Sequence, residues 1–169
     1  NNVTIQSNSS ALNVNLAAAQ STDGAISFTN TTINTNNGNL TTSSNTTGSS
    51  TTALTFAGNN SFTIGSGNAT LTADGGLTSN GVDIGGNLSV NVGTGSNVVI
   101  NGSASGSGIG INLVANSAIN LLAGGGGNFT LNGVAVNNAA VQIANTSLNI
   151  SSGTYFVNGS STGTTWPAP

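Results

Sequence analysis

The sequence predicts an all-β protein, a right-handed parallel β-helix (β-solenoid) of about five three-stranded coils. Three observations support this fold. Similar units recur along the chain with a period of roughly 26 to 37 residues, which is in the range of solenoid repeats. Each unit contains short segments in which apolar and polar residues alternate, as in a strand with one buried face. Finally, Gly, Asn, Thr and Ser, which disfavour helix, make up 101 of the 169 residues.

The first predicted strand of each unit is a triplet whose outer residues are mostly apolar and whose middle residue is mostly Thr. The units start near residues 2, 39, 68, 97, 128 and 154. Their triplets are Val3-Thr4-Ile5, Leu40-Thr41-Thr42, Ala69-Thr70-Leu71, Val98-Val99-Ile100, Phe129-Thr130-Leu131 and Tyr155-Phe156-Val157.

The second and third predicted strands repeat with the same alternation. The second strands are Ile26-Ser27-Phe28, Leu54-Thr55-Phe56, Val82-Asp83-Ile84, Ile111-Asn112-Leu113 and Val141-Gln142-Ile143, with starts 28, 28, 29 and 30 residues apart. The third strands have the inward pairs Ile33/Thr35, Phe62/Ile64, Leu88/Val90, Ile119/Leu121 and Leu148/Ile150. Because the side-chain period of a strand is two, we expect Val82, Ile84, Ile111 and Leu113 to point inward, with Asp83 and Asn112 pointing outward.

Stacked coils also account for the composition. Equivalent residues on neighbouring coils lie about 4.8 Å apart, so a repeated charge would face a like charge. Amide and hydroxyl side chains can instead donate to and accept from their own kind, and Asn tolerates the left-handed backbone of a sharp corner. We therefore expect a structural column of asparagines at one corner: Asn30, Asn59, Asn87, Asn116 and Asn145.

The whole chain, residues 1–169, is predicted to be one solenoid segment, with 160–169 as a tail or partial cap ending in Trp166-Pro167-Ala168-Pro169. A right-handed winding is expected because parallel crossovers have that hand. Two alternatives are a β-sandwich of short strands and a fibre-like trimer of chains. The sandwich is less favoured, because hairpins would mirror the pattern rather than repeat it unit by unit.

The charged groups exclude several classes of function. Lys, Arg, His and Cys are absent, and the only carboxylates on side chains are Asp23, Asp74 and Asp83. Without cations, binding to nucleic acid is not expected. Zinc, haem and iron–sulfur sites lack ligands, so no metal and no cofactor is predicted. No enzyme activity is expected, because no two of the aspartates share a column and could act as a catalytic pair. A calcium-binding array is not expected either, because only Asp74 and Asp83 show the nine-residue spacing of calcium-binding repeats. No apolar run reaches the ~18 to 20 residues of a membrane helix, so the chain is not expected to be membrane-embedded.

The unit openings resemble the filamentous-haemagglutinin-like, or two-partner-secretion, exoproteins of Gram-negative bacteria. The resemblance rests on Gly38-Asn39-Leu40-Thr41, Gly67-Asn68-Ala69-Thr70-Leu71 and Gly127-Asn128-Phe129-Thr130-Leu131, on the later pairs Asn101-Gly102, Asn132-Gly133 and Asn158-Gly159, and on Gly108-Ile109-Gly110-Ile111-Asn112-Leu113. It implies a protein that is secreted through an outer-membrane partner and then displayed at the cell surface or released as an adhesin. Two features differ from the family. The amino-terminal secretion domain of the family is not visible in this sequence, and the shafts of family members usually carry some Lys and Arg, which this sequence lacks.

We therefore expect a rigid shaft of a secreted or cell-surface adhesin that mediates attachment, with a host-cell or matrix receptor as its partner. The alternative is a subunit of a self-assembling extracellular filament, whose partners are neighbouring solenoid sequence or end-to-end copies of itself. Asn-x-Ser/Thr motifs occur thirteen times, and we expect candidate glycosylation at corner or exposed sites: Asn30, Asn59, Asn87, Asn101, Asn145 and Asn158. An ice-binding face built on Thr4, Thr41, Thr70 and Thr130 is a weaker hypothesis, because Val99 and Phe156 interrupt that column.

Overall fold

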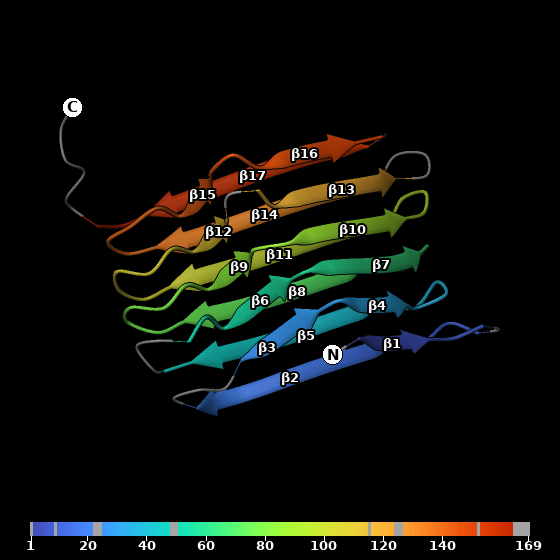
Figure 1. The fold of residues 1–169 in the computed structure, drawn as a ribbon, viewed down its shortest axis with the longest axis horizontal. Coiled ribbons are helices and arrows are strands. Elements are labelled where there is room, and N and C mark those ends of the chain that lie inside the picture. The colour runs from blue at the N-terminus through green and yellow to red at the C-terminus, as the bar shows by residue number, and fades with distance from the viewer. Residues whose placement is uncertain are drawn as a thin grey trace.

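The computed structural model describes residues 2–8, 10–21, 25–47, 51–114, 116–123, 127–151 and 153–163. These residues form a parallel β-solenoid of seventeen strands in three sheets, with no helix among them. Figure 1 shows the strands stacked from β1 and β2 at one end to β16 and β17 at the other. The predicted all-β solenoid of about five turns is therefore confirmed.

The three sheets are named here after their first strands. The β1 sheet contains β1 (Val3–Gln6), β4 (Thr31–Asn34), β7 (Asn59–Gly65), β10 (Asn87–Val92), β13 (Ala118–Ala123) and β16 (Ser147–Ile150). The β2 sheet contains β2 (Val14–Ser21), β5 (Leu40–Thr46), β8 (Ala69–Gly75), β11 (Asn97–Ala104), β14 (Asn128–Ala135) and β17 (Thr154–Ser161). The β3 sheet contains β3 (Ile26–Thr29), β6 (Leu54–Ala57), β9 (Val82–Ile84), β12 (Ile111–Leu113) and β15 (Val141–Ile143).

One rung of the solenoid is one strand from each sheet, taken in chain order. The first rung is β1, β2 and β3, and the fifth is β13, β14 and β15. A sixth rung has β16 and β17, and no strand follows them in the described part of the chain. We call positions that pair in register on successive strands of one sheet a column.

The second predicted strands stack as expected. Ile26, Leu54, Val82, Ile111 and Val141 form one column of the β3 sheet. Val82, Ile84, Ile111 and Leu113 are each 0% exposed, while Asp83 and Asn112 between them are only half-buried. The two-residue alternation therefore gives the correct inward face, because a strand can bury only one of its two sets of side chains.

The core is a narrow apolar stack enclosed by the three sheets. In the first three rungs the Phe28 and Phe56 rings stack with centroids 5.3 Å apart and the edge of Phe62 meets Phe28, also at 5.3 Å. Leu, Ile and Val fill most of the interior of the later rungs, together with Phe129 in the fifth rung. The core is thus one continuous column of side chains, to which every rung contributes.

The prediction was wrong for the first unit. Val3-Thr4-Ile5 does not stack on Leu40-Thr41-Thr42: Val3 pairs with Thr31 in the β1 sheet. The partner of Leu40 is Val14, in β2. Both segments alternate apolar and polar residues, so the two-residue pattern alone could not decide which of them begins the β2 sheet.

The third predicted strands are out of register at one step. Ile33 pairs with Phe62 as predicted, but Phe62 pairs with Val90, whereas Leu88 pairs with Asn60. A slip of two residues keeps the same face inward, so alternation does not detect it. The sequence also gives no apolar signal at Asn60, which is 3% exposed and points inward. Its Oδ1 accepts from the Thr31 N–H at 3.0 Å and its Nδ2 donates to the Ala57 carbonyl at 3.1 Å, which satisfies the buried amide.

Candidate functional site

The five asparagines of the predicted corner column do not share one position. Asn30, Asn116 and Asn145 are corner residues with φ of 49°, 67° and 47°. Asn59 and Asn87 are instead the first residues of β7 and β10, and they pair with each other. Asn87 pairs with Ala118 rather than with Asn116, two residues earlier. The structure therefore joins Asn30, Asn59 and Asn87 and sets Asn116 and Asn145 apart.

The first group forms a ladder of side-chain amides. The Asn59 N–H donates to Asn30 Oδ1 at 2.9 Å, and Asn87 Nδ2 donates to Asn59 Oδ1 at 2.8 Å. In the second rung the left-handed corner is taken by Gly58, with φ of 67°. A Cβ on Gly58 would lie 2.3 Å from Asn30 Oδ1, so only glycine fits beneath that amide.

A longer amide ladder, which sequence reasoning missed, lies at the start of the strands of the β2 sheet. It consists of Asn13, Asn39, Asn68, Asn97 and Asn128. The N–H groups of Asn39, Asn68 and Asn97 each donate to the Oδ1 of the asparagine one rung earlier, at 2.9 Å, and Asn128 Nδ2 donates to Asn97 Oδ1 at 2.9 Å. The signal was present, because four of these residues are the starts of predicted units, but they were interpreted only as strand openings.

Two more amide ladders continue into the sixth rung. Asn132 Nδ2 donates to Asn101 Oδ1 at 2.9 Å, and Asn158 Nδ2 donates to Asn132 Oδ1 at 2.8 Å. In the β1 sheet, Asn149 Nδ2 donates to Asn120 Oδ1 at 2.8 Å. Side-chain amides of asparagine therefore cross each of the five boundaries between successive rungs.

The candidate glycosylation sites differ in exposure. Asn30, Asn59, Asn87, Asn145 and Asn158 are exposed, whereas Asn101 is half-buried in β11. Asn30, Asn59, Asn87, Asn101 and Asn158 also take part in the ladders. Asn145 is an exposed corner residue, and it is the one of the six for which no side-chain hydrogen bond is seen.

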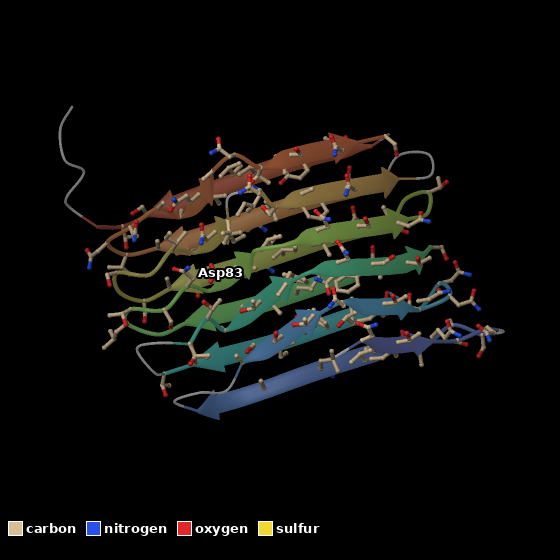
Figure 2. The ribbon with its side chains drawn as sticks, in the orientation of Figure 1. Asp83 is labelled. Atoms are coloured by element: carbon tan, nitrogen blue, oxygen red, sulfur yellow. The ribbon has the colours of Figure 1, made fainter. Side chains whose placement is uncertain are left out.

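The aspartates lie apart from one another. Asp83 is in β9 of the β3 sheet, where Figure 2 labels it, and Asp74 is in β8 of the β2 sheet. Asp23 lies outside the described residues. Asp83 accepts hydrogen bonds from Asn80 Nδ2 at 2.7 Å, Thr52 Oγ1 at 2.8 Å and Asn112 Nδ2 at 3.0 Å. These three donors tie together the second, third and fourth rungs, so the arrangement around Asp83 serves to join strands.

Asp74 faces a surface groove of about 380 Å³. It accepts a hydrogen bond from the hydroxyl of Ser103 and pairs across the sheet with Asn45. The groove is lined by Asn45, Thr46, Thr47, Asp74, Gly75, Gly76, Leu77, Ser103 and Ser105. Across the described ranges, no three acidic, His or Cys side chains gather as a metal site would require.

The proposed threonine face is not one column. Thr4 lies in the β1 sheet, while Thr41, Thr70 and Thr130 share a column of the β2 sheet with Asn15, Val99 and Phe156. The assignment of Thr4 was wrong for the same reason as that of its triplet: the first strand belongs to a different sheet.

The last two rungs leave inward-pointing apolar side chains uncovered. Val157 continues the column of Ile100 and Leu131, which are 1% and 0% exposed, yet Val157 is 43% exposed. Ile143, at the end of the β3 sheet, is 45% exposed, whereas its neighbour Leu113 is 0% exposed. Tyr155 stacks on Phe129 at 5.2 Å, and burial raises the pKa of its hydroxyl.

Comparison with family models, with curated proteins and with solved structures finds no match to the chain. No helix in the described ranges has the length and hydropathy to cross a membrane. The structure thus establishes a parallel β-solenoid of about five turns, and the filamentous-haemagglutinin-like family remains a resemblance carried by the unit openings.

Proposed function

We propose that the chain is a structural segment of a secreted or cell-surface adhesin, a rigid shaft that holds a binding region away from the cell. The observation that carries this proposal is the set of asparagine ladders, which cross every boundary between rungs on the outer surface. Backbone hydrogen bonds already join the rungs, and the asparagine amides add further hydrogen bonds from rung to rung along the axis.

The scarcity of charged side chains, three aspartates in 169 residues, supports the same role. A shaft made of identical rungs stacks like on like, and each repeated charge would cost about 1 kcal/mol of repulsion in water. Asparagine avoids this cost, because its carbonyl accepts from the rung above while its amide donates to the rung below. Secretion through an outer-membrane partner and attachment to a host-cell or matrix receptor are the further parts of this proposal, and they rest on the resemblance.

Displaying the chain as a spacer tests the proposed function. The 169 residues are placed between an outer-membrane anchor and a small peptide tag, and adhesion of the cells to a surface coated with antibody against the tag is measured under flow. We expect firm adhesion with the native chain and weaker adhesion with a flexible Gly/Ser spacer of the same length. Equal adhesion with both spacers, at equal display levels, would refute the shaft.

The alternative, a subunit of an extracellular filament, is favoured by one specific observation, the uncovered apolar residues of the sixth rung. Glycosylation at the exposed sites is compatible with either role, and Asn145 is the site we expect to be modified most fully. Mass spectrometry of the protein from its natural source checks this, and an unmodified Asn145 beside a modified Asn101 would contradict it.

A further inference from the structure

We propose that the carboxyl-terminal end of the solenoid binds the amino-terminal end of a second copy, in the same register that joins successive rungs within one chain. This rests on the proposed rod and names its partner. In this contact β1 of the second copy adds to β16, and β2 of the second copy adds to β17.

The apolar columns continue across such a contact. Leu16 begins the column that ends at Val157, and Val14 begins the column that ends at Tyr155. In the β1 sheet, Val3 begins the column that ends at Leu148. A second copy docked in register therefore places Leu16 over Val157, Val14 over Tyr155 and Val3 over Leu148, so each inward apolar residue of the sixth rung meets another apolar residue.

The exposed residues at both ends fit this partner. Val157 is 43% exposed and Val3 is 45% exposed, although both lie at inward positions. Burying such side chains stabilises the contact by about 25 cal/mol for each Å² removed from water. The edge strands also match in length, because β17 and β2 have 8 residues each and β16 and β1 have 4 each.

No charged side chain of the described residues lies at the contact. The charged side chains of the described residues are Asp74 and Asp83, and both lie in the third rung. The edges also lack the lysines and prolines with which sheet proteins usually block the addition of another strand, as far as the described residues extend. Because the two surfaces are different, the contact is head-to-tail and does not close, so repetition produces a fibre.

Two complementary variants test the proposal. Val157→Asp places an unpaired charge on the carboxyl-terminal surface, and Leu16→Asp places one on the amino-terminal surface. We expect the native chain to form linear oligomers that grow with concentration in sedimentation velocity and in negative-stain electron micrographs. Each variant alone should need a concentration at least ~10-fold higher to associate. A 1:1 mixture of the two should form a dimer that does not grow, since each variant keeps the surface that the other lacks.

Controls separate this contact from the rod itself. Thr70→Asp adds the same charge at an exposed position of β8 and should leave fibre growth unchanged. Circular dichroism checks that the two end variants are folded, and Val157→Ser replaces Val157→Asp if the aspartate variant does not fold.

A native chain that stays monomeric at all concentrations would overturn the contact but leave the rod intact. Dimers formed by Leu16→Asp alone at the concentration at which the native chain associates would also overturn it, because they would show tail-to-tail pairing. Failure of the spacer assay with normal fibres would refute the proposed function but not the contact.

Discussion

Val82→Asp tests whether the interior of the solenoid is correctly placed. Val82 is 0% exposed and lies in the middle of its column, between Leu54 and Ile111. The change removes a buried apolar side chain, worth about 1.5–3 kcal/mol. It also buries a carboxyl group without a partner, which costs roughly 2–7 kcal/mol. The sum is comparable with the whole stability of a domain, about 5–15 kcal/mol, so we expect most of the chain to unfold.

The assay is denaturant and thermal unfolding followed by circular dichroism, with Ser61→Asp as the control. Ser61 is exposed on β7, in the same rung, so the control adds the same charge outside the core. Burial raises the pKa of the introduced carboxyl at position 82, because the charged form is poorly solvated there. The penalty is therefore full near neutral pH and is lost as the pH falls below ~4, where the carboxyl becomes protonated in both states. If Val82→Asp melted with the control at neutral pH, the inward face would be wrongly assigned.

Three further predictions concern the single tyrosine, an amide ladder and salt. Tyr155 is the only tyrosine of the chain, and burial raises the pKa of its hydroxyl, so the folded state holds that proton more tightly than the unfolded state. Stability should be constant below the ordinary tyrosine pKa of about 10 and should fall above it; alkaline melting curves in which Tyr155→Phe behaves like the native chain would contradict this. Asn68→Ala removes the Oδ1 that accepts from the Asn97 N–H at 2.9 Å and should lower stability by about 1 kcal/mol, measured by urea unfolding, whereas Asn68→Asp keeps the acceptor and should lose less. Because the chain has no Lys, Arg or His, there are no ion pairs between side chains to screen, and melting temperatures in low and high sodium chloride should agree closely; a large difference would indicate an ion site.

The sequence was sufficient for the fold class and for most of the register, because alternation and repeat spacing act at every rung. It was insufficient where two solutions bury the same face. The assignment of Val3–Ile5 to the wrong sheet and the slip between Phe62 and Leu88 are both of this kind. The repeat spacing also predicts Asn116 and Asn145 in one column with Asn87. In the structure both lie two residues before the position that pairs in the Asn87 column. The backbone geometry at the corners determines the sheet and the register of each strand, and this geometry cannot be derived from composition and alternation.

The amide ladder from Asn13 to Asn128 could have been predicted from the same repeat starts that defined the units. Each of these asparagines lies just before, or is the first residue of, a strand of the β2 sheet. Equivalent positions on stacked rungs lie about 4.8 Å apart, close enough for amide hydrogen bonds. The exposure of Val157 could not be predicted in the same way. Its triplet resembles the other triplets, and only the structure shows that no described strand covers it.

The central claim is that successive rungs stack in register along one axis, and distances between spin labels test it most directly. The chain has no cysteine, so labels attach only where one is introduced. Asn15, Thr130 and Phe156 share a column in the first, fifth and sixth rungs. With excess unlabelled chain to suppress contacts between molecules, pulsed electron paramagnetic resonance should give about 19 Å for labels at Asn15 and Thr130 and about 24 Å for labels at Asn15 and Phe156, a difference of one rung. Equal distances, or a shorter distance for the second pair, would contradict the stacked solenoid.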